Sequence, residues 1–287
     1  MLRKYIPAVK DFLSYVHSRN LSFNSDEDID RALTIFLEKG LYEQLFAFDR
    51  ANAVFFGLLA IFPELGRKLP TAHRAWKAWE RQNLGGEGAP IPEQAVELVA
   101  HWFAQSDRHD LDLLVRLIFD CYLRSSDWEK LRKEDIYRSG ETVAIILGVS
   151  ERGEKAKTGP NQGVIVDCPL IAEALWSKAQ ALQPGAVLFS TSPEAFRQQW
   201  TRAKAATGLS WIGPPHDLRH GGASRDVEAG TRSLEQVRRR GRWKILDSVQ
   251  RYTKTWLLVR ERGRLTPQQI VQAEELQQER PSRIIHE

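Results

Sequence analysis

A group of side chains between Arg124 and Tyr252 has the types needed to attack a phosphodiester. It comprises a phenol, an imidazole, an indole and three cations, which in chain order are Arg124, Lys157, His216, Arg219, Trp243 and Tyr252. In-line displacement at phosphorus needs a nucleophile, neutralisation of charge on the nonbridging oxygens, and a proton for the leaving alkoxide. A phenol is a weak nucleophile, with a free pKa of about 10, so it needs the cationic neighbours that this group supplies. The group therefore predicts an enzyme that cuts and rejoins DNA.

Each remaining member has a predicted role. The two arginines can each present a planar fork of donors to the phosphate oxygens. His216 suits hydrogen bonding to the phosphate or acceptance of the tyrosine proton, and the indole N–H of Trp243 can donate to an oxygen. Lys157 is expected to protonate the departing 5′ oxygen, with Lys155, two residues earlier, as the alternative. Any of these residues alone would more often be a surface or core residue, so the prediction depends on the combination.

Basic residues are concentrated near the end of the chain. The whole chain has a net charge of +4, whereas residues 197–264 contain 16 Lys or Arg against 6 Asp or Glu, a net +10. A compact part of this excess consists of Arg238, Arg239, Arg240, Arg242 and Lys244. We expect these five side chains to contact DNA phosphates, which contributes salt-dependent affinity with little sequence information. The alternative is a charged helix face exposed to solvent.

The elements that must position these residues fall into two domains. Apolar residues recur at helical spacing throughout residues 1–84, which predicts a small helical bundle whose second helix ends at Gly40. Residues 85–92 are dense in Gly and Pro and predict a flexible linker. Residues 93–287 form the second domain and contain every candidate residue.

The second domain is expected to combine helices with a small sheet. Thr142 to Val149 and Val164 to Val166 are apolar runs separated by a polar, Gly-containing stretch, which predicts a hairpin whose long tip carries Lys157. Ala186 to Phe189 is expected to add a short strand, and Ser126 to Arg132 a short helix capped by a serine. The predicted fold class is mainly α with a small antiparallel β-sheet (α+β).

Composition excludes several other classes of protein. The longest apolar stretch, residues 51–62, ends at Pro63 and is shorter than the roughly 18 to 20 residues that cross a bilayer. No apolar signal core follows the N-terminus, so neither a membrane span nor secretion is expected. Cys121 and Cys168 lack metal-type spacing and predict buried free thiols in a reducing compartment.

From Phe119 onward, the motifs resemble those of the tyrosine recombinases, the family of the phage integrases and of Cre. The run from His216 to His220 is similar to the family's His-x-Leu-Arg-His box, and Gly241-Arg242-Trp243 is similar to its Gly-x-His or Gly-x-Trp element. Tyr252 follows Trp243 by nine residues, where the family has its nucleophile. A tryptophan instead of a second histidine is similar to Cre-like members.

Two upstream elements complete this resemblance, which covers roughly residues 90 to 256. Arg124 and its neighbours resemble the box that holds the family's first arginine, and Lys157 falls at the position of the family's catalytic lysine. The family often has a glutamate three residues after the first arginine. Here Asp127 keeps the carboxylate on a shorter side chain, as a supporting residue of the site.

The resemblance implies a two-domain DNA clamp with a tyrosine recombinase catalytic domain. Tyr252 would form a 3′-phosphotyrosyl bond and release a 5′-hydroxyl that completes strand exchange, with no cofactor and no metal. The implied partners are double-stranded DNA and further copies of the chain, as a tetramer on DNA. The implied location is the cytoplasm (nucleoid) of a prokaryotic or phage host, or the nucleus for a eukaryotic mobile element.

Two other functions fit the same residues. One is a type IB topoisomerase-like enzyme that relaxes DNA, and the other is a domesticated DNA-binding protein that no longer cuts. The tail from Thr266 to Gln278 bears on this choice through Ile270, Val271, Ala273 and Leu276. These residues either dock on a neighbouring protomer, which favours the recombinase, or fold back on their own domain.

Overall fold

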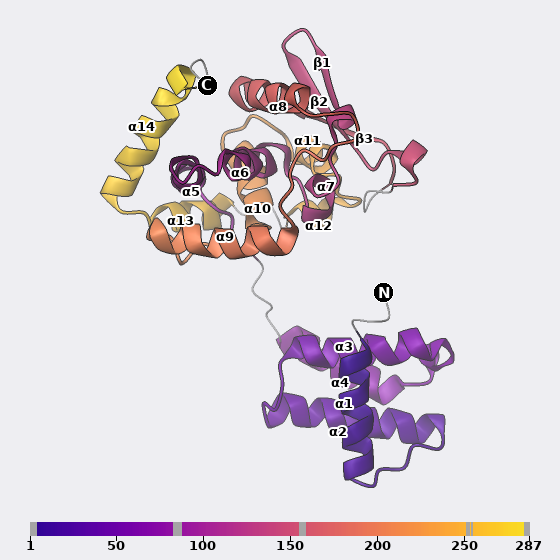
Figure 1. The fold of residues 1–287 in the computed structure, drawn as a ribbon. Coiled ribbons are helices and arrows are strands. Elements are labelled where there is room, and N and C mark those ends of the chain that lie inside the picture. Colours follow the sequence, from indigo (N-terminus) through magenta and orange to yellow (C-terminus); the bar gives the residue numbers. More distant parts are fainter. Residues whose placement is uncertain (1–4, 83–87, 155–158, 251–252, 254, 284–287) are drawn as a thin grey trace. The chain divides into compact units, whose positions relative to one another are not determined.

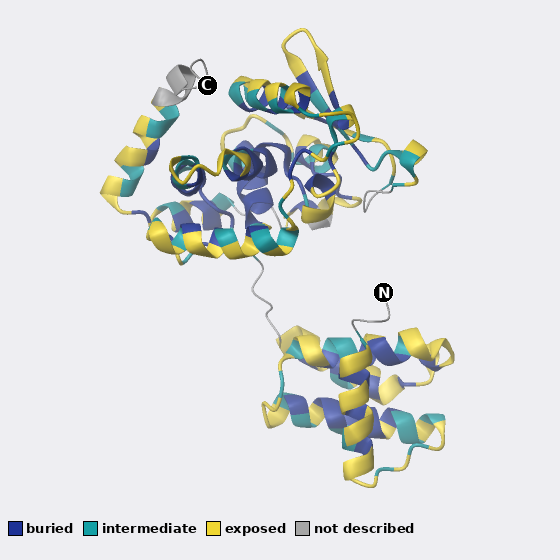
Figure 2. Cartoon of the chain, in the orientation of Figure 1, coloured by how far each residue is buried: buried dark blue, intermediate teal, exposed yellow. Residues whose placement is uncertain are grey.

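The computed structural model describes residues 5–82, 88–154, 159–250, 253 and 255–283. The chain falls into two compact units, Met1–Gly86 and Glu87–Glu287, each with its own buried core. Figure 1 shows the elements of both units, and Figure 2 shows that the buried residues lie on the inner faces of their helices. In the part of the chain that the structure describes, no helix is long and apolar enough to cross a membrane.

The first unit is built from helices alone among its described residues. These are α1 (Ile6–Ser18), α2 (Asp26–Tyr42), α3 (Phe48–Ile61), the 3-10 helix Pro63–Arg67 and α4 (Pro70–Gln82). The buried carboxylate of Asp30 accepts hydrogen bonds from the backbone N–H groups of Thr71 (3.0 Å) and Ala72 (2.7 Å). Since the first N–H groups of a helix have no partner within it, Asp30 joins α2 to the start of α4.

The expected end of the second helix at Gly40 is wrong, because α2 continues to Tyr42. Gly40 has a packing role instead. A Cβ atom there would lie 2.4 Å from the ring of Phe46 and 2.7 Å from that of Trp79. The missing side chain thus lets two aromatic rings pack against the helix backbone.

The second unit surrounds its core with helices and places a small sheet at one side (Figure 1). Its helices are α5 (Glu93–Gln105), α6 (His109–Cys121), α7 (Ser125–Trp128), α8 (Pro169–Ala181), α9 (Pro193–Ala206), α10 (Asp217–Glu228), α11 (Leu234–Arg240), α12 (Leu246–Gln250), α13 (Thr255–Arg262) and α14 (Pro267–Arg283). Short 3-10 helices span Lys133–Asp135 and Ser150–Arg152. The expected class, mainly α with a small antiparallel sheet, is confirmed.

The sheet has the order β1-β2-β3, with β1 (Ile136–Ser139), β2 (Thr142–Leu147) and β3 (Gln162–Val166) all antiparallel. The predicted hairpin is confirmed as β2 and β3, in which Ile145 pairs with Val164. The strand expected at residues 186–189 is wrong, since Val187 makes only an isolated bridge with Arg132. The sequence did not predict β1, because only Ile136 of its residues is buried and no alternation of apolar and polar residues results.

The short helix α7 differs from its prediction at both ends. It spans Ser125–Trp128 instead of residues 126–132, and Arg124 occupies its N-cap position. The Asp127 carboxylate accepts a hydrogen bond from the backbone N–H of Arg124 at 2.9 Å. Asp127 therefore fixes the backbone of Arg124 at the start of this helix.

Helix α14 contains the apolar tail and packs against α5 of its own unit. Ala273 is completely buried, and Ile270 and Leu276 pack against the main core. Val271 points outward and is 53% exposed. Of the two alternatives for the tail, the structure thus shows the one in which the tail folds back on its own domain.

Candidate active site

Arg124 lies where α6 turns into α7, and its side chain points to a second segment. Its Nη2 donates to the backbone carbonyl of Arg242 at 3.3 Å. Its Nη1 is buried and has no hydrogen-bond partner among the described residues. Buried donors are nearly always paired, so this nitrogen lacks the acceptor that such a position normally has.

Arg219, on α10, is 1% exposed and is held by the same two segments. Its Nη1 donates to the carbonyl oxygen of Tyr122, and its Nη2 donates to that of Gly241. The guanidinium carbon also lies 4.1 Å from the ring centroid of Trp243, a cation–π distance. The structure thus brings Arg219 and Arg124 to the same two segments, which lie more than a hundred residues apart in the sequence.

Trp243 belongs to a small buried cluster of its own. The cluster is formed by Tyr122, Ala223, Val237, Trp243 and Val249, which join the end of α6 to α10, α11 and α12. Gly241 leaves room for the indole, because a Cβ atom there would lie 1.6 Å from the Trp243 ring. The cluster therefore fixes the indole as the platform on which Arg219 stacks.

Arg242 was expected to contact DNA, but its side chain is buried inside the protein, with 7% of the residue exposed. Its Nη2 donates to Asp127 Oδ2 at 2.8 Å and to the Tyr122 carbonyl at 3.2 Å. Burial lowers the pKa of this guanidinium; the charge of Asp127 opposes the shift and that of Arg124 adds to it. The Asp127 carboxylate therefore accepts from the guanidinium of Arg242 and from the backbone N–H of Arg124, whose own guanidinium donates to the Arg242 carbonyl.

Arg240 is a second correction to the predicted DNA-contacting group. Its guanidinium donates to the carbonyl of Asp120 at 2.9 Å and to that of Ile165 at 2.9 Å. It also forms ion pairs with Asp120 (3.2 Å) and Asp167 (2.5 Å). Like Arg242, it joins elements of the protein, because its donors are used by internal acceptors.

Arg238, Arg239 and Lys244 lie nearer the surface. Arg238 and Arg239 share Glu235 as an ion-pair partner, at 2.7 and 2.9 Å. Hydrogen bonds from Arg238 and then Arg239 lower the pKa of Glu235 to about 2. The side chain of Arg239 is nevertheless 76% exposed. These residues line an open hollow of about 390 Å³, together with Gln162, Gly163, Arg242 and Trp243.

His216 is exposed at the N-cap of α10, three residues before Arg219 on the same helix. Its ring centroid lies 5.4 Å from that of His220, which is buried beside Asp217. Lys155, Lys157 and Tyr252 lie outside the described residues. Their predicted roles as general acid and nucleophile therefore stay predictions.

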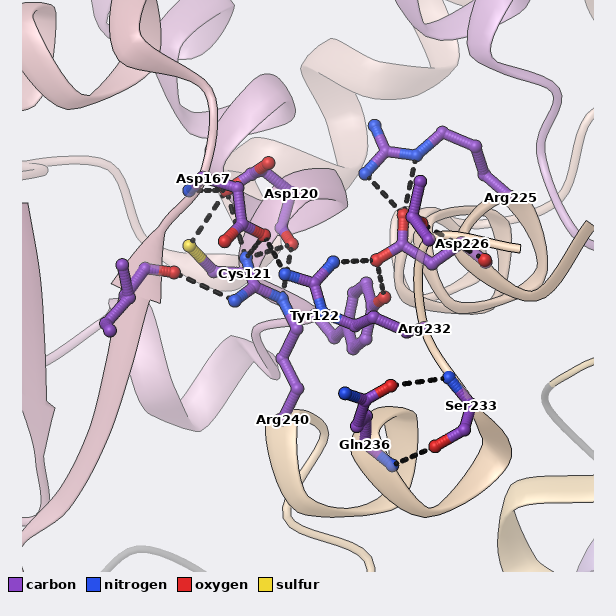
Figure 3. Close-up of polar contacts among 12 residues, drawn as sticks. Asp120, Cys121, Tyr122, Asp167, Arg225, Asp226, Arg232, Ser233, Gln236 and Arg240 are labelled. Atoms are coloured by element: carbon purple, nitrogen blue, oxygen red, sulfur yellow. Dashed lines mark hydrogen bonds and ion pairs between the residues drawn. The ribbon is translucent and has the colours of Figure 1, made fainter. Parts of the chain in front are cut away.

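A network of charged side chains that no sequence pattern predicted lies beside these residues (Figure 3). The Tyr122 hydroxyl donates to Asp226, and burial and then the charge of Asp226 raise the pKa of this phenol above its ordinary value. Arg232 pairs with both Asp226 and Asp167. Together with Arg240, the network joins α6 and α10 to the end of β3, the strand that follows the hairpin tip.

No sequence motif marks Tyr122. The one signal in the sequence was its position directly before the loop that holds Arg124. Tyr122 adopts a left-handed backbone conformation, with φ of 50°, at the end of α6. This turn directs its carbonyl to both Arg219 and Arg242. Among the residues that the structure describes, no cluster of three or more His, Cys, Asp or Glu side chains is arranged to hold a metal ion.

No family model and no curated protein matches the sequence. The fold is similar to that of a XerH site-specific recombinase bound to palindromic difH substrate in a post-cleavage complex, with a TM-score of 0.62 and 18% identity over 86% of this chain and 75% of that one. It is also similar to a lambda integrase dimer bound to a COC' core site, with a TM-score of 0.59 and 18% identity over 89% of each chain. A Tn1549 transposon integrase in complex with transposon right end DNA has a TM-score of 0.60 and 11% identity over 94% of this chain and 92% of that one. The chain thus has the fold of the tyrosine recombinases.

Proposed function

We propose that this chain is a site-specific DNA recombinase that cuts and rejoins duplex DNA through a 3′-phosphotyrosyl bond to Tyr252. One observation carries the proposal: Arg124, Arg219 and Trp243, from three separate segments, meet around the carbonyl groups of Tyr122 and residues 241–242. Fixed cationic donors are what a phosphoryl transition state needs, because its charge resides mainly on the phosphate oxygens. The similar structures are complexes with DNA, which also supports a DNA substrate.

In the proposed reaction the phenolate of Tyr252 attacks phosphorus and the 5′ oxygen leaves with a proton from Lys157. The buried Nη1 of Arg124 is suited to donate to a nonbridging oxygen. Arg219 supplies a second fixed positive charge at the same place. His216, exposed on the same helix, is the proposed hydrogen-bond partner of the phosphate or acceptor of the tyrosine proton. Attack of a 5′-hydroxyl on the phosphotyrosine reverses the step, so bond energy is conserved.

DNA would also contact surfaces outside this centre. The hollow lined by Arg238, Arg239 and Lys244 lies next to Trp243 and suits phosphates that flank the cleaved bond. In the first unit, α4 buries Trp76 and Trp79 and exposes Arg74, Lys77 and Arg81, three positions on one helix face. We propose this face as the DNA-binding surface of residues 1–84, the core-binding domain.

The decisive experiment traps the covalent bond. The protein is incubated with a nicked duplex from which a short strand diffuses away after cleavage, and the products are separated on a denaturing gel. The parent should form a covalent adduct, whereas Tyr252→Phe should form none yet bind DNA with nearly unchanged affinity, because one hydroxyl is lost from an interface dominated by phosphate contacts. An adduct in the variant would identify another nucleophile. A parent that binds DNA without cutting would support the non-cutting alternative.

A further inference from the structure

Arg242 has a backbone conformation that an arginine rarely adopts. Its φ is +57°, in the left-handed region that favours glycine, because the Cβ of other residues approaches the following carbonyl oxygen. Such a conformation persists only where the surroundings hold it in place, and it is concentrated at functional sites. The contacts of Arg242 show what holds it.

The side chain of Arg242 is anchored at three points, one of which is the carbonyl of Arg240, to which its Nη1 donates at 3.3 Å. Its Nη2 donates to Asp127 Oδ2 at 2.8 Å and to the carbonyl of Tyr122 at 3.2 Å. The Asp127 side chain is fully buried in this pair. Since a buried carboxylate needs a paired cation, the guanidinium and the carboxylate hold each other in place.

The backbone of Arg242 contacts Arg124, whereas its side chain contacts Asp127 and Tyr122. Its carbonyl accepts a hydrogen bond from Arg124 Nη2 at 3.3 Å, while Asp127 accepts one from the Arg124 backbone N–H at 2.9 Å. The three residues thus form a closed ring of interactions: the Arg124 backbone to Asp127, Asp127 to the Arg242 side chain, and the Arg242 carbonyl to the Arg124 side chain. The left-handed φ closes this ring, because it sets where the carbonyl of residue 242 lies.

We propose that Arg242 is a positioning residue for Arg124. Through its ion pair with Asp127 and its left-handed backbone, it holds the Arg124 guanidinium in place at the candidate site. Arg242 itself makes no phosphate contact, although it lines the basic hollow. The inference rests on the proposed function and assigns to Arg242 a part in the cleavage step that is separate from DNA affinity.

The experiment compares Arg242→Gly with a surface control, Arg239→Ala. Glycine keeps the left-handed backbone accessible and removes the whole side chain, including the guanidinium. Cleavage is measured in a single turnover with all DNA bound, and affinity is measured as a function of salt. Loss of a phosphate contact reduces the slope of log K against log salt by about 0.9. We expect this reduction for Arg239→Ala and an unchanged slope for Arg242→Gly.

The cleavage rate provides the test of positioning. We expect Arg242→Gly to cleave about 10²-fold more slowly, the loss that a misplacement of about 1 Å produces. In an Arg124→Ala background the same substitution should cause little further loss, because the residue through which it acts is gone. Arg242→Lys, which keeps the charge and serves if the glycine variant does not fold, should remain slower than the parent because an ammonium does not reproduce the fixed fork.

Three results would overturn the inference. A reduced salt slope for Arg242→Gly would make it a direct DNA contact, and a full additional loss in the Arg124→Ala background would mean that it acts independently of Arg124. A parent-like cleavage rate in both Arg242 variants would show that the ring does not affect the reaction. A parent chain that never cuts contradicts the proposed function, whereas a parent that cuts alongside equally fast variants contradicts this inference alone.

Discussion

Tyr122 connects the candidate site to a buried ion pair through both its backbone and its side chain. Its carbonyl accepts from Arg219 and Arg242, and its hydroxyl donates to Asp226. Asp226 also pairs with Arg225 at 2.8 Å and with Arg232. Removing the hydroxyl therefore takes one hydrogen-bond donor away from the buried Asp226 carboxylate and leaves its two arginine partners in place.

We expect Tyr122→Phe to lower the free energy of unfolding near neutral pH by about 1 to 3 kcal/mol, the cost of a lost partner for a buried acceptor. The pKa of Tyr122 is raised in the folded state, by burial and then by Asp226. Its stabilising contribution is thus complete below about pH 10, where the unfolded phenol ionises, and is lost as the pH rises through the folded pKa. The difference between parent and variant should shrink above about pH 10.

Urea denaturation across this pH range checks the prediction, with Tyr137→Phe as control because Tyr137 is exposed. A difference between parent and Tyr122→Phe that grows with pH would contradict it.

The choice between the two lysines of the hairpin tip can also be tested at single residues. Lys157→Ala should block cleavage of an ordinary phosphodiester but spare a substrate with sulfur at the 5′ bridging position, because a thiolate leaves without a proton. Lys155→Ala should cleave both substrates at nearly the parent rate. Single-turnover rates on the two substrates decide the matter, and rescue of the Lys155 variant by sulfur would reverse the assignment.

Among the elements, α11 has a basic sequence whose charge is largely matched by acidic neighbours. Arg238 and Arg239 pair with Glu235, and Arg240 pairs with Asp120 and Asp167. In the proposed DNA complex Glu235 would compete with phosphate for Arg238, which is half-buried, and for Arg239, which is exposed. The net charge of this stretch therefore overstates the number of side chains that are available to DNA.

We expect Glu235→Gln to tighten DNA binding roughly threefold at low salt, with a smaller gain at high salt, because exposed ion pairs are weak and screened. Titration of a labelled duplex at several salt concentrations measures the effect. Glu64→Gln, on the 3-10 helix of the first unit, is a matched control for the loss of one surface charge. Weaker binding by Glu235→Gln would mean that Glu235 holds the arginines in their DNA-binding positions.

Helix α14 provides a second prediction at this scale. Ala273 is completely buried against the core, whereas Val271 on the same helix is exposed. Ala273→Asp should destabilise the second unit by more than about 3 kcal/mol, since it buries an unpaired charge. Val271→Asp should change stability by less than about 0.5 kcal/mol. Thermal and urea unfolding of the two variants test this, and equal effects would show that α14 does not pack on α5 in solution.

At the scale of the whole molecule, the recombinase and topoisomerase proposals differ in assembly. Strand exchange needs two duplexes and four active sites, whereas relaxation needs one protein on one duplex. Because α14 covers its own unit, a contact between protomers through the tail requires either its outer face, with Val271, or its release from α5. The oligomeric state on DNA is thus the property to measure.

We expect the full chain to form a tetramer on DNA that contains its target site, and to recombine a plasmid with two such sites. Light scattering of the purified complex gives the number of protomers, and a gel resolves the recombination products. Val271→Asp, which should leave the fold intact, tests whether the outer face of α14 contributes. Rapid relaxation of a plasmid without any preferred site, by a protein that stays monomeric on DNA, would favour the topoisomerase-like alternative.

Much of the fold was predictable because it depends on local patterns. The β2–β3 hairpin follows from two β-branched runs, and α9 begins at Pro193 where the Ser192 side chain caps the helix at 3.1 Å. Elements with weak local signals were missed: β1 buries one residue, and Gly40 lies inside α2 because aromatic rings from other segments pack on it. In the site, Arg124, Asp127, Arg219 and Trp243 were named from motifs and meet in the structure.

The sequence alone determined which residue types are present and in what order, and this sufficed to predict the fold class and the group of residues that suits phosphoryl transfer. It did not distinguish Arg239, which is exposed, from Arg240 and Arg242, which are buried, although all three lie within four positions. Their environments depend on partners such as Asp120 and Asp127, more than a hundred residues away in the chain. Only the tertiary structure decides between phosphate and carboxylate as the partner of a guanidinium, because both offer the same oxygen acceptors and the choice depends on which one the folded backbone brings within reach.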